Sequence, residues 1–511
     1  MNARTGIVAL LLLSAPVVAL SQSTAVTRAA ATITQQDVRR RINIIADDSM
    51  GGRNTPSPGL DKAARYIASE FQRLGLKPGG DSGTFLLRYP ITARQLLAGE
   101  SAIRFGQISG DRAFRTTLTD GAAFLSGPTD GTFKGSVVLV GGRLVLDSLK
   151  PDDVRGRIVV YVPEASATQP TGGFRTLIGL SRSGARGVVV VVGSDSVVAE
   201  YMQSQTRVRT TAGDRARGAP VIAVRESAVL AQLPDAAQQF EQLRAAPVTV
   251  VQPMLDWEGE IALRDSAVAT AYAPDVVGIL EGSDPLLKRE YLVYSAHMDH
   301  IGTTGDPGAA CRAMGADSIC NGADDDGSGT VGVLELAQAY SQRGARPKRS
   351  VIFLTVSGEE HGLWGSEWFV NHPPVPLPQI VADLNADMIG RNWKDTIVAI
   401  GKEHSDLGST LNRVNDAHPE LAMHAIDDRW PEQSFYTRSD HFNFAQRGVP
   451  ILFFFNGVHP DYHRASDSPD KIDAEKESRI VKLLFFVGQD VANRKERPQW
   501  VPSSYQQIVV P

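Results

Sequence analysis

The sequence is poor in cysteine and has no excess of basic residues. Only Cys311 and Cys320 occur among 511 residues, and the absence of a Cys-x-x-Cys pair argues against a zinc ribbon. The 57 aspartates and glutamates outnumber the 52 lysines and arginines, which gives a formal net charge of −5. Because phosphate backbones and anionic membranes attract basic proteins, we expect no nucleic acid among the partners.

Long apolar runs are also missing after the N-terminus. Arg4 precedes an apolar run from Gly6 to Leu20, and small residues around Ser21 offer a cleavage site. The run is shorter than the roughly 20 apolar residues that span a bilayer, so a signal peptide at 1–21 is favoured over a membrane anchor. We therefore expect an exported protein, periplasmic or extracellular, with no membrane association after cleavage.

Export permits a disulfide between the two cysteines, with two free thiols as the alternative. Closing so short a loop contributes about 2–3 kcal/mol in the chain-entropy model. The expected disulfide therefore stabilises a loop in the second half of the chain.

The length exceeds that of one ordinary domain, and 42% of the residues are hydrophobic, which supports sizeable buried cores. Residues 32–49 and 59–76 have apolar positions at helical spacing. Short β-rich runs separated by Gly, Pro and Asp then extend from about 115 to 251, which indicates a separate insert. The expected organisation is a signal peptide (1–21), an N-terminal part of the main domain (22–114), the insert (115–251), the rest of the main domain (252–495) and a tail without assigned structure (496–511).

Strands and helices alternate in the second half of the chain. Apolar strand-like runs and amphipathic helical runs follow one another: strands at 275–282, 290–299, 350–357, 379–390 and 449–457, and helices at 329–342, 365–372 and 473–494. Such alternation predicts an α/β fold, with a mixed, largely parallel sheet flanked by helices. The strands read as continuous apolar runs because both faces of the sheet are covered.

Histidine is absent before His297, so all ten histidines lie in the second half. Potential metal ligands directly follow the expected strands: His297, Asp299, Glu359, Glu360, Asp387 and His463. Asp325 lies at the glycine-rich start of an expected helix. Ligands bind at the carboxyl edge of open α/β sheets, so these separate segments are expected to meet in one cleft.

The chemistry of these residues suits zinc, which accepts imidazole nitrogen and carboxylate oxygen. Two histidines and three carboxylates exceed the needs of one catalytic ion, whereas two Zn²⁺ ions that share one carboxylate would use all five. Taken singly, a His-x-Asp pair or an acidic run is often a solvated surface feature. Their joint occurrence at strand and helix ends favours a metal centre.

The ordered segments SAHMDHIG, NGADDDGSG, VSGEEHGLWGS, NADMIG and DYHRASD resemble the co-catalytic zinc aminopeptidase family, which also includes glutamate carboxypeptidase and transferrin-receptor-like ectodomains. The N-terminal GGRNTPSPGLDKAARYI extends the resemblance over most of the mature chain. It implies that Asp325 bridges two zinc ions, with His297 and Asp387 in one site and Glu360 and His463 in the other. It also implies a cis peptide after Asp325.

The same resemblance implies roles for three further residues. Glu359 would be the general base, Asp299 would orient His297, and Tyr462 would donate to the oxyanion. The insert resembles a protease-associated domain, with a rigid β-rich spacer as the alternative.

Other polar residues near these motifs have open roles. His300 and His361 lie off the ligand positions, so structural or pocket-rim roles are expected. Asp440 and His441 either shape the substrate pocket or form a buried hydrogen-bonded pair.

The function expected from these features is that of a di-zinc aminopeptidase acting on peptides. A glutamate-carboxypeptidase-like enzyme is the nearest alternative and needs clustered arginines, for which Arg429 and Arg438 are candidates. A glutaminyl-cyclase-like enzyme is disfavoured by the insert. A non-catalytic receptor-like ectodomain is disfavoured because all five ligands and Glu359 are present.

Overall fold

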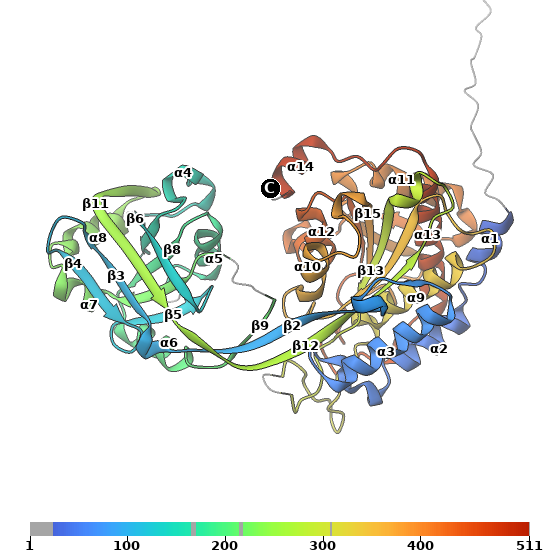
Figure 1. Cartoon of the computed structure of the whole chain (residues 1–511), viewed down its shortest axis with the longest axis horizontal. Coiled ribbons are helices and arrows are strands. Elements are labelled where there is room, and N and C mark those ends of the chain that lie inside the picture. Colours follow the sequence, from blue (N-terminus) through green and yellow to red (C-terminus); the bar gives the residue numbers. More distant parts are fainter. Residues whose placement is uncertain (1–23, 165–169, 214–217, 307–308, 510–511) are drawn as a thin grey trace, which may run out of the picture. The chain divides into compact units, whose positions relative to one another are not determined.

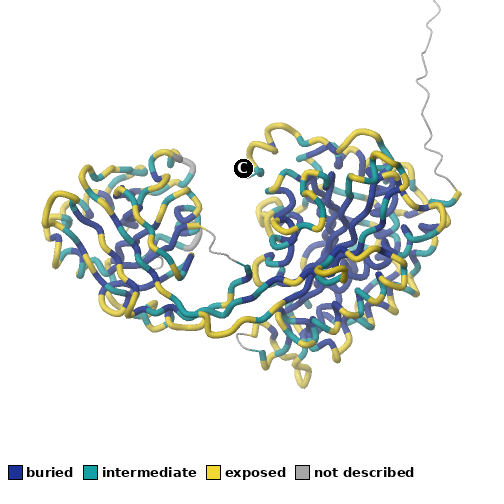
Figure 2. The backbone as a smooth tube through the Cα atoms, in the orientation of Figure 1, coloured by how far each residue is buried: buried dark blue, intermediate teal, exposed yellow. Residues whose placement is uncertain are grey.

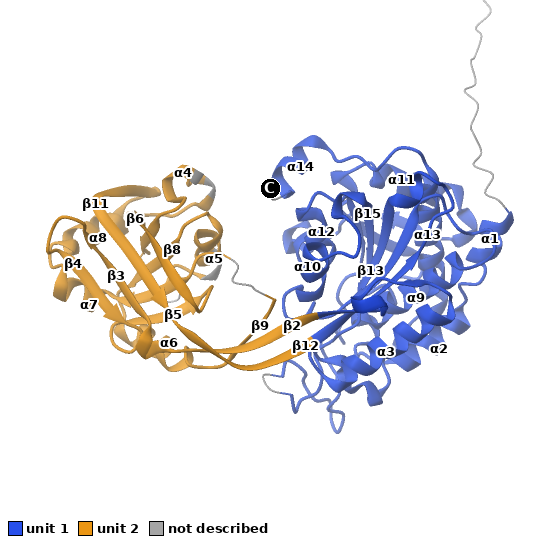
Figure 3. Cartoon of the chain, in the orientation of Figure 1, with its two compact units in different colours: residues 1–88, 273–511 blue, residues 89–272 orange. Residues whose placement is uncertain are grey.

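The computed structural model describes residues 24–164, 170–213, 218–306 and 309–509. The expected signal peptide at 1–21 lies outside these residues. The chain divides into two compact units, one formed by Met1–Arg88 with Ala273–Pro511 and the other by Tyr89–Tyr272 (Figure 3). The strands β2 (Leu86–Leu96) and β12 (Asp265–Leu280) each run across this boundary.

The first unit contains a mixed sheet with a parallel centre (Figure 1). Neighbouring strands follow the order β17-β16-β18-β15-β13-β14-β12. The central parallel strands are β13 (Tyr291–His297), β14 (Ser350–Val356), β15 (Ile380–Ala386) and β18 (Ile451–Phe454). At the two sides, β12 is antiparallel to β14 and β16 (Thr396–Ile400) is antiparallel to β18, while β17 (His424–Ile426) runs parallel to β16.

Helices cover both faces of this sheet. One face carries α9 (Gly329–Tyr340) and α13 (Ala474–Asn493), with α2 (Gln35–Ile45), α3 (Pro58–Arg73) and α11 (Leu407–Ala417) packed on them. The other face carries α10 (Trp364–Asn371) and α12 (His441–Gln446). All residues of β14 and β15 are therefore buried (Figure 2). The predicted largely parallel sheet flanked by helices is confirmed.

Local sequence signals fix the starts of the N-terminal helices. The Thr34 side chain caps α2 by accepting from the Asp37 N–H, and Ser57 caps α3 by accepting from the Leu60 N–H. Pro58 occupies the first turn of α3, where its fixed φ suits a helix start. These caps position the two helices that pack against α9.

The C-terminal tail differs from the prediction, which assigned it no structure. Residues Pro502–Ile508 form α14, and the Trp500 indole donates to the Gly448 carbonyl at 2.9 Å. A seven-residue helix is too short to show a periodic apolar pattern, so it could not be predicted from the sequence.

The second unit is built on an eight-stranded sheet with the order β4-β3-β11-β6-β7-β8-β10-β5. Its strands are β3 (Ala102–Gln107), β4 (Ala113–Thr117), β5 (Ala122–Ser126), β6 (Gly131–Gly141), β7 (Ile158–Val162), β8 (Gly187–Val192), β10 (Val221–Arg225) and β11 (Val250–Leu263). Four of them, β6, β7, β8 and β10, are parallel. The unit has its own hydrophobic cores on the two sides of this sheet.

This unit is larger than the insert expected at 115–251, because β3, β4 and the end of β11 belong to its sheet. It also contains helices that the sequence did not reveal: α5 (Phe174–Arg182), α6 (Asp195–Ser204), α7 (Glu226–Gln232) and α8 (Ala236–Ala245). The resemblance to a protease-associated domain stays a prediction.

Two smaller expectations can be checked directly. Cys311 and Cys320 form the expected disulfide, with Cα atoms 5.8 Å apart. Within the described ranges, no helix combines the length and the apolar character needed to cross a bilayer.

Candidate metal centre

The predicted ligands come from separate elements at one edge of the first unit's sheet. His297 is the last residue of β13, and Asp387 directly follows β15. Glu360 lies just after β14, and His463 lies in the loop between β18 and α13. Asp325 lies in the buried turn Ala323–Ser328 that precedes α9. The carboxyl edge of the parallel strands thus gathers these side chains.

Asp325 lies between two imidazoles. Its Oδ1 is 3.3 Å from His297 Nε2, and its Oδ2 is 3.2 Å from His463 Nε2. A second carboxylate accompanies each imidazole: Asp387 Oδ1 is 3.6 Å from His297 Nε2, and Glu360 Oε2 is 3.3 Å from His463 Nε2. The geometry therefore consists of two imidazole–carboxylate sets that share one aspartate.

These residues fit a bound cation by their chemistry and by their unsatisfied oxygens. Ligand atoms of His297, Asp325 and Asp387 all lie within 4.8 Å of one another. Asp325 Oδ2 and Asp387 Oδ1 are buried and accept no hydrogen bond from the described residues. Buried carboxylate oxygens normally have a partner, and zinc accepts such oxygens together with imidazole nitrogen.

His300 belongs to the same cluster but makes a different contact. It is fully buried, and its Nδ1 lies 2.8 Å from Glu360 Oε1 and 3.6 Å from Asp325 Oδ2. His300 thus approaches the Glu360 oxygen that does not face His463. This buried position differs from a place at the pocket rim. Ligand atoms of His300, Asp325 and Glu360 all lie within 4.8 Å of one another, so these three residues form a second group that could hold a metal ion. His361, by contrast, is exposed and lies 3.0 Å from Asn54 Oδ1.

Electrostatics keep the shared carboxylate ionised. Burial by itself would raise the pKa of Asp325, but the imidazoles of His300, His297 and His463 hold it well below its usual value. Burial likewise opposes the charged form of His463, yet Asp325 and Glu360 raise its pKa to about 10. The carboxylates and imidazoles of this buried site thus shift each other's pKa in opposite directions.

The cis peptide implied by the family resemblance is present between Asp325 and Asp326. Asp326 is buried and is not a candidate ligand; its carboxylate accepts from the backbone N–H groups of His297, Gly329 and Met388 at 2.8–3.2 Å. It thereby ties the end of β13, the start of α9 and the loop after β15 together. Because this role depends on the loop geometry, it could not be predicted from the acidic run at 324–326.

Two other residues that the sequence analysis missed support the ligands. The Asp467 carboxylate accepts from the N–H groups of Asp324 and Asp325 at 3.0–3.2 Å. The Ser439 hydroxyl donates to Asp387 Oδ2 at 2.9 Å. Asp467 ends the segment DYHRASD, so its place in that motif was the available signal.

Asp299 contacts His297 mainly through its backbone. His297 Nδ1 is 3.2 Å from the Asp299 carbonyl and 3.7 Å from its carboxylate. The carboxylate accepts from the Thr55 hydroxyl at 2.9 Å and from the Glu359 N–H at 3.3 Å. Asp299 therefore joins the His297 loop to the segment that carries Glu359.

Glu359 and Tyr462 line a pocket beside the predicted ligands. Burial raises the pKa of Glu359 well above its usual value, although His297 opposes this shift. The Tyr462 ring stacks on the His463 ring with centroids 3.9 Å apart, and burial raises the pKa of its hydroxyl. A half-buried carboxyl and a phenol therefore face the same space as the ligand cluster.

Apolar side chains and one arginine complete the pocket. Met388, Phe453, Phe455 and Val458 contribute apolar surface. Arg438 also lines it, with its guanidinium 4.6 Å from the centre of the Phe435 ring. The other candidate arginine, Arg429, instead lies over the Trp393 ring at 4.9 Å and is not part of the lining.

Asp440 and His441 are both buried and do not line this pocket. His441 Nε2 is 2.8 Å from the Tyr436 carbonyl, and burial lowers the pKa of His441 to about 3. Both side chains are thus buried, but they are not hydrogen-bonded to each other, and both Asp440 carboxylate oxygens accept no hydrogen bond from the described residues. A role of the pair in shaping the substrate pocket stays a prediction.

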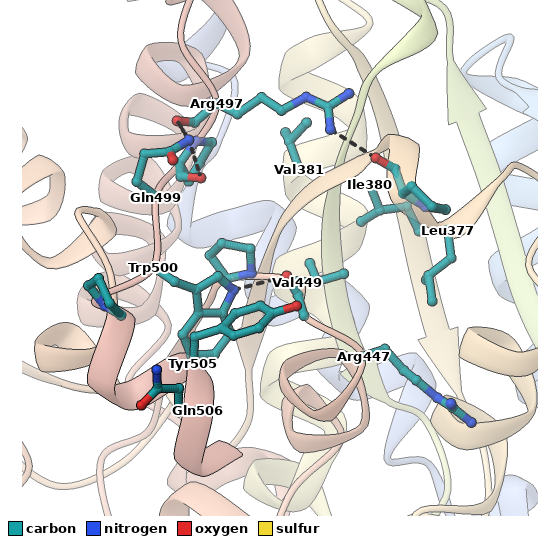
Figure 4. Close-up of a pocket in the computed structure, with 15 residues that line it drawn as sticks. Leu377, Ile380, Val381, Arg447, Val449, Arg497, Gln499, Trp500, Tyr505 and Gln506 are labelled. Atoms are coloured by element: carbon teal, nitrogen blue, oxygen red, sulfur yellow. Dashed lines mark hydrogen bonds between the residues drawn. The ribbon is translucent and has the colours of Figure 1, made fainter. Parts of the chain in front are cut away.

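A larger cavity lies at the opposite edge of the sheet (Figure 4). It measures about 590 Å³ and is lined by the first residues of β15, by Val449 and Pro450 just before β18, and by the tail residues Arg497, Trp500 and Tyr505. It contains none of the predicted ligands or catalytic residues. Size alone therefore does not identify the functional site here.

Comparisons with known proteins agree with this geometry. The family model "Peptidase family M28" matches residues 275–487, which hold all five predicted ligands and Glu359. Relatives of the chain include a probable leucine aminopeptidase and a probable zinc metalloprotease. Together with the family match, they define the class as the zinc metallopeptidases. The matched segment belongs to peptidase family M28, which confirms the predicted zinc aminopeptidase family.

Individual relatives are distant. The chain is 26% identical over 227 residues to a probable leucine aminopeptidase of Arthroderma otae, covering 43% of this chain and 58% of the relative. It is 23% identical over 258 residues to aminopeptidase YwaD of Bacillus subtilis, covering 48% and 51%. The match to leupeptin-inactivating enzyme 1 of Streptomyces exfoliatus is 30% identical over 171 residues and covers 33% and 36%. The chain thus spans between about a third and three fifths of the length of these curated relatives.

Among solved structures, the aminopeptidase from Aneurinibacillus sp. strain AM-1 aligns with a TM-score of 0.47 at 16% identity, over 92% of this chain and 97% of that chain.

Proposed function

We propose that this chain is an exported di-zinc aminopeptidase that removes N-terminal residues from peptides. The observation that carries the proposal is the position of Asp325, whose two carboxylate oxygens face two different imidazoles at 3.2–3.3 Å. In this proposal His297, Asp325 and Asp387 hold one ion, and Asp325, Glu360 and His463 hold the other. Bound zinc would polarise the scissile carbonyl and acidify the attacking water.

The remaining chemistry falls to the side chains around this cluster. Glu359 takes a proton from the attacking water and delivers it to the departing amine, for which its place in the pocket is suited. Tyr462 donates a hydrogen bond to the oxygen that gains charge. Asp299 holds the His297 ring and the backbone of Glu359 in place through its contacts with His297 Nδ1 and with the Glu359 N–H.

The pocket lining supports an aminopeptidase over a glutamate-releasing carboxypeptidase. Binding a substrate's terminal carboxylate and an acidic side chain together requires several cationic groups. Of the two candidate arginines, only Arg438 lines the pocket. The apolar surface of Met388, Phe453 and Phe455 suits an uncharged substrate side chain instead.

Two further features bear on the proposal. The N-terminal sequence pattern and the Cys311–Cys320 disulfide support export. The full set of five ligands together with Glu359 supports an active enzyme over a receptor-like ectodomain.

The proposal is tested with a substrate panel and a zinc measurement. Purified protein is expected to bind two zinc ions per chain and to cleave aminoacyl anilides with a free N-terminus. The same compounds with an acetylated N-terminus should resist cleavage, because the enzyme is an exopeptidase. Cleavage of blocked substrates at equal rates, or zinc binding without hydrolysis of any peptide, contradicts the proposal.

A substitution of Glu359 tests the assigned base. Glu359→Gln keeps the size of the side chain but removes the proton acceptor, so kcat should fall by about 100- to 10,000-fold while zinc content is retained. Glu432→Gln, at an exposed residue in the loop before Phe435, serves as the control and should leave kcat unchanged. Turnover of the Glu359 variant near that of the control would show that another group is the base.

A further inference from the structure

Arg53, in the segment GGRNTP of the N-terminal part, is fully buried and far in sequence from every predicted ligand. Its guanidinium donates only to backbone carbonyls: Nε to Met298 at 2.7 Å, one terminal nitrogen to Ile45 and Asn321 at 2.9 and 2.6 Å, and the other to Gly322 at 2.9 Å. Among the described residues, all the hydrogen-bond partners of this guanidinium are backbone oxygens and none is a carboxylate. Arg53 therefore binds the main chain of other segments and no other described side chain.

Three of these carbonyls, those of Met298, Asn321 and Gly322, belong to the two loops that carry the central ligands, and the fourth belongs to Ile45 at the end of α2. Met298 directly follows His297, and Gly322 lies three residues before Asp325. His297 and Asp325 approach each other to 3.3 Å, so the two loops must be held in a defined relative position. One rigid, planar group that binds both loops meets this requirement.

The backbone around Arg53 is shaped for the same contacts. Gly52 has φ +65°, and a Cβ there would lie 2.3 Å from the Gly302 carbonyl oxygen and 2.6 Å from that of Cys320, so only glycine fits. Arg53 itself has φ 51°, which is uncommon for a residue with a side chain. Such a conformation persists where the surroundings hold it in place, as the four side-chain hydrogen bonds do here.

Backbone hydrogen bonds reinforce the contact. The Gly302 N–H donates to the Gly52 carbonyl at 2.9 Å, and the His300 N–H donates to the Arg53 carbonyl at 3.3 Å. Thr55, two residues further on, donates to Asp299 and accepts from the Gly358 N–H at 3.1 Å. Residues 52–55 thus contact the loops after β13 and β14 and the turn before α9.

We propose that Arg53 is a positioning residue of the metal centre, which sets the separation of the His297 and Asp325 loops and thereby the affinity for zinc. This inference rests on the proposed ligand set. It concerns binding of the ions, since Arg53 does not line the pocket beside Glu359.

The chain offers a matched control in Arg349. This arginine is also fully buried and donates to the carbonyls of Val491, Arg494 and Lys495, but it precedes β14 at the edge of the sheet away from the ligands. Unlike Arg53, it also pairs with a carboxylate, since its Nε donates to Glu290 at 2.7 Å. Loss of either guanidinium leaves buried carbonyls without donors, so both substitutions should destabilise the fold. Only the substitution of Arg53 should change the metal centre.

The test compares Arg53→Gln and Arg53→Lys with Arg349→Gln and Arg349→Lys. Zinc content and affinity are measured by competition with a chelator, and the stability of the zinc-free proteins is measured by urea unfolding. We expect both pairs to lose stability, whereas only the Arg53 variants bind zinc about 10- to 100-fold more weakly. The lysine variants keep a buried cation with up to three hydrogen-bond donors. If the glutamine variants do not fold, zinc affinity is compared between the two lysine variants.

The outcomes separate this inference from the proposed function. If the wild-type protein binds no zinc, the proposed centre itself is wrong. If the wild type binds two ions and the Arg53 variants bind them as tightly as the Arg349 variants do, the positioning role is wrong and the centre stands. Failure of both Arg53 variants to fold in the presence of zinc, while both Arg349 variants fold, would show a general structural role and also overturn the inference.

Discussion

At the scale of single residues, Asp325 is the position on which the proposed centre depends. Each of its oxygens faces a different imidazole, whereas His463 contacts only Asp325 and Glu360 among the predicted ligands. Removing the shared residue and removing a residue of one set should therefore have different consequences.

We expect Asp325→Ala to lose both zinc ions together, because each ion would lose a ligand. His463→Ala should chiefly lose one ion and retain the other. Metal content after dialysis against a weak chelator measures the difference. Equal loss of zinc in the two variants would contradict the shared role of Asp325.

The candidate ligands could be predicted from sequence because parallel strands end at one edge of a sheet. His297 and Asp387 directly follow long apolar runs, so their positions follow from the strand pattern alone. The roles of Arg53 and Asp326 could not be predicted in this way. Both act through hydrogen bonds to backbone groups of distant loops, and such contacts depend on loop conformations that leave no periodic signal.

At the scale of elements, the apolar strands and the long amphipathic helices could be predicted, whereas short elements could not. The strands β13, β14 and β15 are buried on both faces and therefore read as continuous apolar runs. The region between β15 and β18 gave no clear pattern, although it contains β16, α11 and the six-residue helix α12. Tertiary packing rather than local sequence stabilises elements of that length.

An ion-pair network joins the N-terminal helices to each other. Glu70 of α3 accepts from Arg41 of α2 at 3.0 Å and from Arg73 at 2.9 Å, and its side chain is only 12% exposed. Hydrogen bonding by Arg73 is the main cause that lowers the pKa of Glu70 from 4.5 to about 2. The stabilisation from a lowered carboxyl pKa is present above the unfolded pKa and disappears as the pH falls through the folded one.

We therefore expect Glu70→Gln to lower the free energy of unfolding by roughly 1–2 kcal/mol at pH 7. This range is smaller than the pKa shift alone would give, because Arg73 is exposed and solvent screens its interaction with Glu70. The difference from wild type should shrink as the pH falls from about 4.5 to about 2. Urea unfolding at several pH values measures it. Glu281→Gln, which removes a carboxylate paired with two lysines in an exposed position, is the control and should change stability less. A constant deficit of the Glu70 variant at every pH would contradict the assignment.

At the scale of the whole molecule, all predicted ligands lie in one of the two compact units. They fall within Ala273–Pro511, while Tyr89–Tyr272 has separate hydrophobic cores and contains none of them. A ligand that binds only one folded unit stabilises that unit alone.

Calorimetry of the full chain should accordingly show two unfolding transitions, of which only one responds to zinc. Removing zinc with a chelator should lower that transition by several degrees, since each site contributes about 2.7 kcal/mol when free zinc exceeds its Kd a hundredfold. Calcium addition, which suits oxygen-only sites, is the control. Equal shifts of both transitions, or a single transition, would contradict independent units.

The interruption of the first unit by residues 89–272 affects how a newly made chain reaches its final form. The helix α2 ends at Ile45, and its apolar residues Val38 and Ile42 are buried against α9 and α13, the last of which begins only at Ala474. At the usual pace of synthesis the intervening chain takes on the order of 20–90 s to appear. The helix α2 is therefore complete long before α13 is synthesised, and a truncated product that stops before α13 leaves the apolar face of α2 without this partner.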